Sequence, residues 1–442
     1  MNIAFYLTNK PIENVNCKDI SNGNPGIGGT YYEMLLLCYL MTIHQNGRQR
    51  AILFAESNKN LPSNIEVVIV PSLDDLGKAL TKHDIDILVC NKIGENTLDK
   101  HFFASIHNTK AKVVVWAHCF IPNKTLSYYS KNEKVARVIA VGKEELFTWC
   151  DHKIYNKADY IYNICEYPDF KLKPFSQRGN NVVYIGSIVP LKGLHILTSA
   201  WPKVIEQIKD ANLYIIGGGN LYNNNARLGS YGIAEYFYEK KILKPITGDN
   251  GQILPSVHFC GVMGAEKFDI LNESKVGVPN PSGLTETFGI TAVEMQLAGN
   301  LITTMKCPGY LDTVERSNSI LYDDPLSLAD CIIKLLQRVE YNPQEVITSL
   351  RHKFSAEVLE ERWRQVFDDI YNNVPPVHQA ISSDFAPTLR KLKNRRLQKV
   401  VPFLPSLMLY EDAFLKISYY CNKMLHLNDT VKKIYKRKIR KQ

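Results

Sequence analysis

The sequence lacks the features that mark a disulfide framework, a zinc site or a membrane span. Its ten cysteines are scattered and none forms a C-x-x-C pair, so neither disulfides nor a zinc site are predicted. No run of about 18 apolar residues occurs, so no transmembrane helix is expected. The opening residues, MNIAFYLTNK, read as a short strand and not as a signal peptide. These absences predict a protein of the reducing cytoplasmic compartment.

Net positive charge is absent from the body of the chain and is confined to its end. Residues 390–442 carry 15 Lys and Arg against three acidic residues, whereas residues 1–389 carry 38 basic and 41 acidic ones. The body is therefore not predicted to bind nucleic acid. The basic stretch Arg390–Lys399 is followed by the apolar stretch Val400–Tyr410, and the last eleven residues are again strongly basic.

This combination of basic and apolar residues is typical of segments that attach to anionic membranes. We predict that residues 388–442 bind an anionic membrane surface and hold the protein peripherally on its inner face. A solubilising tail, a contact with another subunit and a nucleic-acid contact are the alternatives for this segment.

Short apolar runs alternate with helical patterns along most of the 442 residues, a length that suits two or three domains. Eleven such runs, from Ile3–Leu7 to Leu301–Thr304, predict strands of parallel sheets that are covered on both faces. A polar seam at Pro168–Asn181 separates two units. We predict domains at residues 1–172 and 173–372, and a basic, partly apolar helical extension at 373–442.

The segment 279–299, PNPSGLTETFGITAVEMQLAG, is the most informative part of the chain. A strand ends at Pro279, a loop follows, and a helix is predicted to begin near Glu286. That helix is apolar almost all round, so it is expected to be buried. Glu286 would suit the helix dipole in the first turn, but Glu294 has apolar neighbours and needs a partner. A buried helix N-terminus after a glycine-containing turn also suits phosphate.

Two further segments of the first unit are candidates for ligand contact. Gly28 and Gly29 end a glycine-rich loop that could approach an anion or a substrate closely, or could simply be flexible. His118 follows an apolar strand at its carboxyl end, the edge that faces the ligand crevice in open α/β sheets. A structural histidine is the alternative.

In the second unit, Gly186 and Ser187 end the first strand, and Gly217–Gly219 end the next. Lys192 lies near a helix N-terminus, where the dipole disfavours a cation. It therefore suggests an anionic partner, although a surface lysine is also possible.

Asp84 and Asp86 match a D-x-D metal motif by letters, but they precede their strand and so lie at the wrong edge of the sheet. No metal site is predicted from them.

Taken together, these residues resemble the retaining glycosyltransferases of family 4, the glycosyl transferases group 1. The E-x7-E signature of that family matches Glu286 through Glu294, with Phe288-Gly289 inside it. The glycine–valine pair ending at Val262 also fits. The resemblance extends over about residues 2–370.

The chain departs from the family pattern at three places. Ser187 stands where many members have arginine, residues 217–255 form a longer insertion, and residues 373–442 lie outside the resemblance. Ser187 favours a relative that binds a nucleotide sugar without turnover. A nucleotide-sugar epimerase of the same architecture is the other alternative.

The resemblance implies a GT-B fold, in which two Rossmann-like doubly wound domains face a central cleft. It implies a metal-independent enzyme without cofactor, which moves a sugar from a UDP or GDP donor to a lipid-linked or surface glycan in polysaccharide or lipopolysaccharide biosynthesis. His118, Lys192 and Glu286 would be catalytic. The implied donor-binding residues are Gly28, Gly29, Gly186, Ser187, Lys192, Gly218, Val262, Glu286, Thr287, Phe288, Gly289, Ile290 and Glu294.

Within that set the resemblance implies distinct roles. Lys192 and the backbone N–H groups of Thr287–Gly289 would stabilise the leaving diphosphate. Glu294 would bind the ribose hydroxyls, and Glu286 and His118 would contact the donor sugar from the two sides of the cleft.

Overall fold

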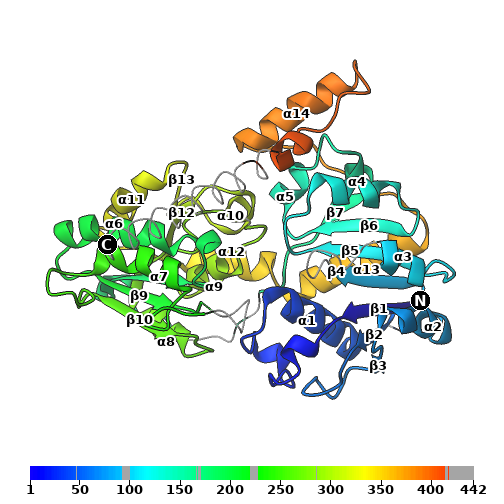
Figure 1. Ribbon diagram of the computed structural model, residues 1–442, viewed down its shortest axis with the longest axis horizontal. Helices are drawn as coiled ribbons and strands as arrows, with labels where there is room; N and C mark the ends of the chain where they lie inside the picture. Colours follow the sequence, from blue (N-terminus) through cyan, green and yellow to red (C-terminus); the bar gives the residue numbers. More distant parts are fainter. Residues whose placement is uncertain are drawn as a thin grey trace, which may run out of the picture.

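Two parallel sheets, each covered by helices on both faces, form the two halves of the computed structural model (Figure 1). The structure describes residues 1–45, 47–91, 100–165, 167, 171–219, 227–284, 286–413 and 417. The first sheet has the order β3-β2-β1-β4-β5-β6-β7, and the second has the order β10-β9-β8-β11-β12-β13. The reversal of strand order beside β1 and beside β8 is the mark of doubly wound sheets.

The elements of the first half are β1 (Asn2–Leu7), α1 (Gly29–Ile43), β2 (Arg50–Ala55), β3 (Val67–Ile69), α2 (Leu73–Lys82), β4 (Ile87–Asn91), α3 (Lys100–Ser105), β5 (Lys112–Ala117), α4 (Asn123–Lys131), β6 (Val135–Ala140), α5 (Lys143–Phe147), the 3-10 turn η3 (Lys153–Lys157) and β7 (Ala158–Tyr160).

Those of the second half are β8 (Gly179–Ile185), the 3-10 turn η5 (Pro190–Lys192), α6 (Leu194–Gln207), β9 (Asn212–Ile216), α7 (Tyr236–Leu243), β10 (Val257–Gly261), α8 (Lys267–Asn272), β11 (Ser274–Gly277), α9 (Ile290–Leu297), β12 (Leu301–Met305), α10 (Pro308–Thr313), β13 (Ile320–Tyr322) and α11 (Leu328–Leu336). Three helices follow: α12 (Gln344–Lys353), α13 (Ala356–Tyr371) and α14 (Ala386–Gln398).

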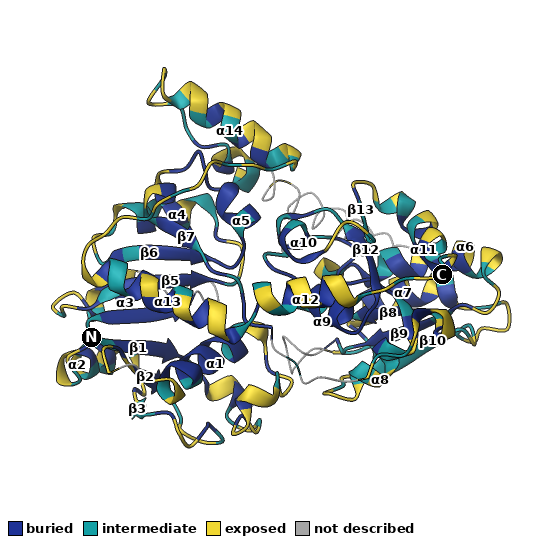
Figure 2. Ribbon diagram, turned by 180° about the vertical axis from the view of Figure 1, so that it is seen from behind, coloured by how far each residue is buried: buried dark blue, intermediate teal, exposed yellow. Residues whose placement is uncertain are grey.

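The predicted fold class is confirmed, and all eleven predicted strands are present. The strands were recognisable because both faces of each parallel sheet are buried, as the dark central strands in Figure 2 show. The two strands that the sequence did not predict, β7 and β13, have three residues each and lie at sheet edges. Such short edge strands leave little apolar pattern to detect.

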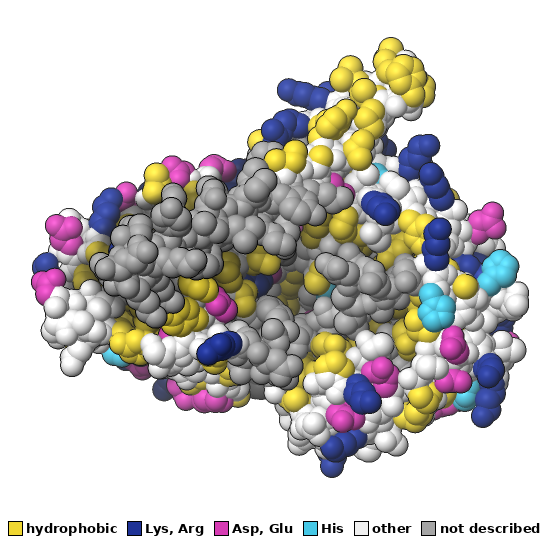
Figure 3. Space-filling model, viewed as in Figure 1, with side chains coloured by type: hydrophobic (Ala, Val, Ile, Leu, Met, Phe, Trp, Pro, Cys, Tyr) yellow, Lys and Arg dark blue, Asp and Glu magenta, His cyan; other side chains and the backbone are white. Residues whose placement is uncertain are grey.

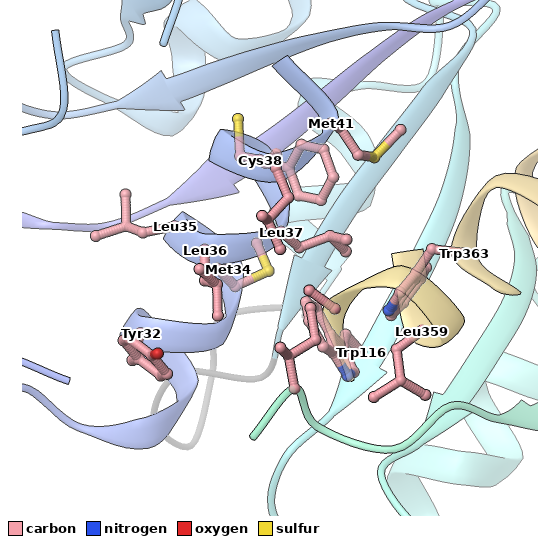
Figure 4. Packing of buried hydrophobic residues seen from close by; sticks show 14 of the residues in the cluster. Tyr32, Met34, Leu35, Leu36, Leu37, Cys38, Met41, Trp116, Leu359 and Trp363 are labelled. Atoms are coloured by element: carbon pink, nitrogen blue, oxygen red, sulfur yellow. The ribbon is translucent and has the colours of Figure 1, made fainter. Parts of the chain in front are cut away.

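Helix α13 leaves the second half and packs on the first sheet beside α1. Its Trp363 lies 4.6 Å, between ring centroids, from Trp116 of β5, and Phe367 lies 6.3 Å from Phe5 of β1. Figure 4 shows Trp363 and Trp116 close together, beside the side chains of α1. The predicted boundary at residue 372 placed this helix in the second domain. Its packing on the first sheet could not be predicted, because the periodicity of a helix does not show which sheet it covers.

The described part of the C-terminal extension also packs on the first half. The carboxylate of Asp151 accepts hydrogen bonds from Asn394 Nδ2 (2.7 Å), Ser406 Oγ (2.8 Å) and the Leu407 amide (2.8 Å). Asp384 pairs with Arg316 of the second half at 2.8 Å. The final basic run of the sequence lies outside the described residues. Among the helices that are described, none has the length and apolar character needed to cross a membrane.

We expect Trp363→Ala to lower the free energy of unfolding by about 3–5 kcal/mol, since it opens a cavity between α13 and the first sheet. Urea denaturation followed by far-UV circular dichroism measures the change. Leu326→Ala is the matched control, because Leu326 is 87% exposed and its truncation should cost no more than about 0.5 kcal/mol. Equal effects of the two substitutions would contradict the packing of α13 described above.

Candidate active site

The carboxyl ends of the strands of both sheets meet across the boundary between the two halves. Thr287 Oγ1, in the loop before α9, donates a hydrogen bond of 2.9 Å to the carbonyl oxygen of His118, which follows β5. Beside this contact, the amide of Glu144 donates to Asp312 Oδ2 at 2.8 Å. Two segments that the sequence marked separately are therefore brought together.

The loop before α9 is longer than predicted, because the helix begins at Ile290 and not near Glu286. Gly289 caps the helix with φ +88°, and a Cβ at this position would lie 2.5 Å from the ring of Tyr310. A left-handed residue with no room for a side chain requires glycine and interrupts the helix. The prediction that Glu286 lies in the first helical turn is therefore wrong.

Glu286 and Lys192, two of the predicted catalytic residues, form an ion pair. The distance from Lys192 Nζ to Glu286 Oε2 is 2.7 Å, and the two side chains are 21% and 14% exposed. Asn280 Nδ2 donates to the same oxygen at 2.9 Å. The negative charge of Glu286 is therefore compensated by Lys192, and not by the helix dipole as predicted.

The loops after β8 and β9 are in contact through glycine. A Cβ on Gly217, whose φ is +144°, would lie 1.9 Å from the carbonyl oxygen of Gly186. The amide of Ile188 donates to the Gly218 carbonyl at 3.0 Å. Ser187 is buried, and its carbonyl accepts a hydrogen bond from Tyr184 at 3.1 Å. The predicted glycine positions therefore form one compact wall beside Lys192.

Glu294 is buried on α9, as predicted, and already has two partners. Lys267 Nζ lies 2.7 Å from Glu294 Oε1, and Tyr167 OH donates to the same oxygen at 2.8 Å. The partner that this buried carboxylate needs is therefore supplied by the protein itself. Lys267 is the first residue of α8, so the argument that singled out Lys192, a cation at a helix N-terminus, would also have found it.

His118 is held neutral in the contact between the halves. Its ring lies 4.4 Å from that of Trp116, and neither ring nitrogen has a hydrogen-bond partner among the residues that the structure describes. Burial lowers its pKa to about 3. A neutral imidazole has one donor and one acceptor nitrogen, so it suits a hydroxyl group better than a phosphate.

The remaining predicted residues lie at the margin of this region. Gly28 caps α1, and a Cβ added to it would lie 3.5 Å from the ring of Tyr31. Gly29 is the first residue of α1 and has open space where a Cβ would be added. Val262 follows β10 and is 57% exposed, and Ile290 is the half-buried first residue of α9. Within the described residues, no hydrogen bond joins Gly28, Gly29 or Val262 to the loop of Glu286.

The D-x-D letters occupy the opposite, amino edge of the first sheet. Asp86 immediately precedes β4, and Lys110 Nζ lies 2.7 Å from Asp86 and 2.8 Å from Asp84. Both carboxylates therefore have a protein cation as their partner, at the edge of the sheet away from His118.

Comparison with known proteins agrees with this architecture. Residues 179–338, from β8 to α11, match the model of the family Glycosyl transferases group 1. A glycosyltransferase structure from Rickettsia africae superposes with a TM-score of 0.58 at 12% identity, covering 84% of this chain and 99% of that one. The fold is GT-B.

Two further solved structures share the GT-B fold. The structure of trehalose-6-phosphate from E. coli bound with UDP-2-fluoro glucose has a TM-score of 0.55 at 11% identity, covering 85% of this chain and all of that one. S. aureus TarM, solved with fondaparinux, alpha-GlcNAc-glycerol and UDP, has a TM-score of 0.50 at 17% identity, covering 66% and 58%. Comparison with curated protein sequences finds no match.

We expect Lys267→Met to destabilise the protein by about 3 kcal/mol or more, because it leaves the Glu294 carboxylate buried without a cation. Chemical denaturation measures this. The control is Lys203→Met, which breaks the exposed pair with Asp330 and should cost less than about 1 kcal/mol. Adding Glu294→Gln to Lys267→Met should recover most of the loss. If the double variant is as unstable as the single one, the charge of Glu294 is not the cause.

Proposed function

We propose that the protein is a retaining glycosyltransferase that moves a sugar from a nucleoside-diphosphate donor to a glycan or lipid-linked acceptor. The observation that carries this proposal is the hydrogen bond from Thr287 to the His118 carbonyl. Because of it, a neutral imidazole and the Lys192–Glu286 pair border the same junction. The match of residues 179–338 to glycosyl transferases group 1 supports it.

The leaving diphosphate gains negative charge as its bond to the anomeric carbon breaks. Lys192 would stabilise that charge, together with the backbone N–H groups of Thr287–Gly289. Within the described residues, the amides of Phe288 and Gly289 donate to no protein acceptor. The oxygen of an acceptor hydroxyl forms the new bond to the anomeric carbon, and its proton passes to the departing phosphate oxygen.

The other roles follow from the protonation states and partners of the side chains. The neutral His118 and the Glu286 carboxylate would each bond hydroxyl groups of the donor sugar. Both contacts of Glu294 fall on Oε1, so we infer that the ribose hydroxyls donate to Oε2. Lys267 would then hold the carboxylate in position through its ion pair with Oε1.

The donor nucleotide is proposed from the comparisons and the acceptor from the C-terminal extension. Two of the similar structures were solved with UDP or a UDP sugar, which supports a UDP donor over a GDP donor. We propose no metal, since Lys192 supplies positive charge at the phosphate site. The basic extension supports peripheral attachment to a membrane and an acceptor of polysaccharide or lipopolysaccharide type.

A panel of donors tests the proposal. Thermal shift with UDP-, GDP-, ADP- and TDP-sugars, in EDTA, should give one nucleotide series that stabilises the protein, because only the folded state binds it. NMR of the same mixtures should show slow release of the nucleoside diphosphate and free sugar. Glu294→Ala should weaken the binding by about 1.5–3 kcal/mol.

The outcomes separate the candidate functions. An epimerised nucleotide sugar would make the protein an epimerase. Binding without any release of the diphosphate would favour the non-catalytic relative to which Ser187 points. Loss of turnover in EDTA with recovery on adding Mn²⁺ would contradict the metal-independent proposal.

We expect Lys192→Ala to lower kcat by about 10²–10³-fold, as for the loss of other groups that stabilise developing charge, and to raise the donor KM much less. Steady-state kinetics of donor hydrolysis measures both constants. Lys244→Ala, at an exposed lysine of the second half, is the control and should leave both unchanged. Unaltered turnover in Lys192→Ala would remove Lys192 from the proposed chemistry.

A further inference from the structure

The end of α14 and the turn that follows it expose apolar side chains on a part of the molecule that projects from the first half. Val400 is 81% exposed and Phe403 is 88% exposed, and Leu397, Leu409 and Tyr410 are exposed as well. Figure 3 shows hydrophobic side chains covering this projection, with Lys and Arg along its sides. Contiguous exposed apolar side chains mark an interaction site.

A pocket of about 480 Å³ lies between this projection and the first half. Its wall on the first half includes Ser127 and Lys131 of α4 and Lys153 of η3, and its other wall includes Arg395 of α14. Phe403 also lines it, so the pocket opens beside the exposed apolar side chains. The volume is within the usual range for small-ligand sites.

The charge of the pocket favours an anion. Lys131, Lys153 and Arg395 contribute three cations. The Arg395 guanidinium lies over the ring of Tyr155, at 4.6 Å from its centroid. Asp151, the acid in the lining, already accepts three hydrogen bonds from the tail. Burial lowers the pKa of His152, so this neighbour adds no positive charge at neutral pH.

We propose that this pocket binds the phosphate headgroup of an anionic phospholipid while Val400 and Phe403 enter the interfacial layer of the membrane. The cations of the pocket favour binding of a phosphate group. The exposed apolar side chains at its edge, Val400 and Phe403, favour a phosphate that is part of a lipid. The inference deepens the membrane attachment in the proposed function and is independent of sugar transfer. Phe403 both lines the pocket and is exposed beside it, so it connects the phosphate contact with the membrane contact.

Point variants test the proposal better than truncation of the tail. Truncation would remove the three hydrogen-bond donors of the Asp151 carboxylate and so could disturb the first half. Full-length protein is sedimented with phosphatidylglycerol/phosphatidylcholine vesicles, without donor. Lys131→Ser/Lys153→Ser should weaken binding about 25-fold, at about 5-fold for each basic residue near the surface. Lys78→Ser/Lys82→Ser on α2 removes the same charge elsewhere on the first half and should change binding less than twofold.

Two further measurements separate the membrane from a soluble phosphate. Phe403→Ser should weaken vesicle binding about tenfold, and glycerol 1-phosphate should compete with the vesicles only at millimolar concentration. Equal vesicle binding by wild type and by Lys131→Ser/Lys153→Ser would contradict the proposal that the pocket binds the headgroup. Saturable binding of glycerol 1-phosphate with no binding to vesicles would contradict the proposal that the bound phosphate belongs to a membrane lipid. Donor turnover of the variants should match the wild type, so failure here is distinguishable from failure of the proposed transferase activity.

Discussion

The hydrogen bond between Thr287 Oγ1 and the His118 carbonyl is the contact on which the account of the site depends. It joins the carboxyl edges of two sheets that are built from separate parts of the sequence. The Glu144 amide and the carboxylate of Asp312 form a second contact beside it, and α13 ties the second half back to the first sheet through Trp363. These contacts hold the carboxyl edges of the two sheets against each other.

Buried charge is the second constraint, and each acid of the E-x7-E segment has its own lysine. Glu286 pairs with Lys192 from the turn after β8, and Glu294 pairs with Lys267 at the start of α8. A carboxylate that has a cation and a hydrogen-bond donor can remain ionised in a buried position. Both lysines come from segments that follow parallel strands, so the sheet that defines the fold also supplies the cations of the site.

The sequence predicted the strands and pointed to a candidate site, because both inferences depend on local pattern. Buried parallel strands are continuous apolar runs, and ligand residues follow their carboxyl ends. The start of α9 was misplaced because the left-handed cap at Gly289 depends on Tyr310, which is distant in sequence. The partners of Glu294, the return of α13 and the docking of the tail on Asp151 were missed for the same reason: they are long-range contacts.

Hydrogen exchange of the full-length protein with and without a UDP sugar tests most directly the claim that both sheet edges bind one donor. Peptides that span Thr287–Gly289, residues 116–119 and residues 186–193 should gain protection together, because the donor would cover amides from both halves. Peptides from α2 should not change. Protection confined to one half, or none at Thr287–Gly289 at saturating donor, would contradict the account.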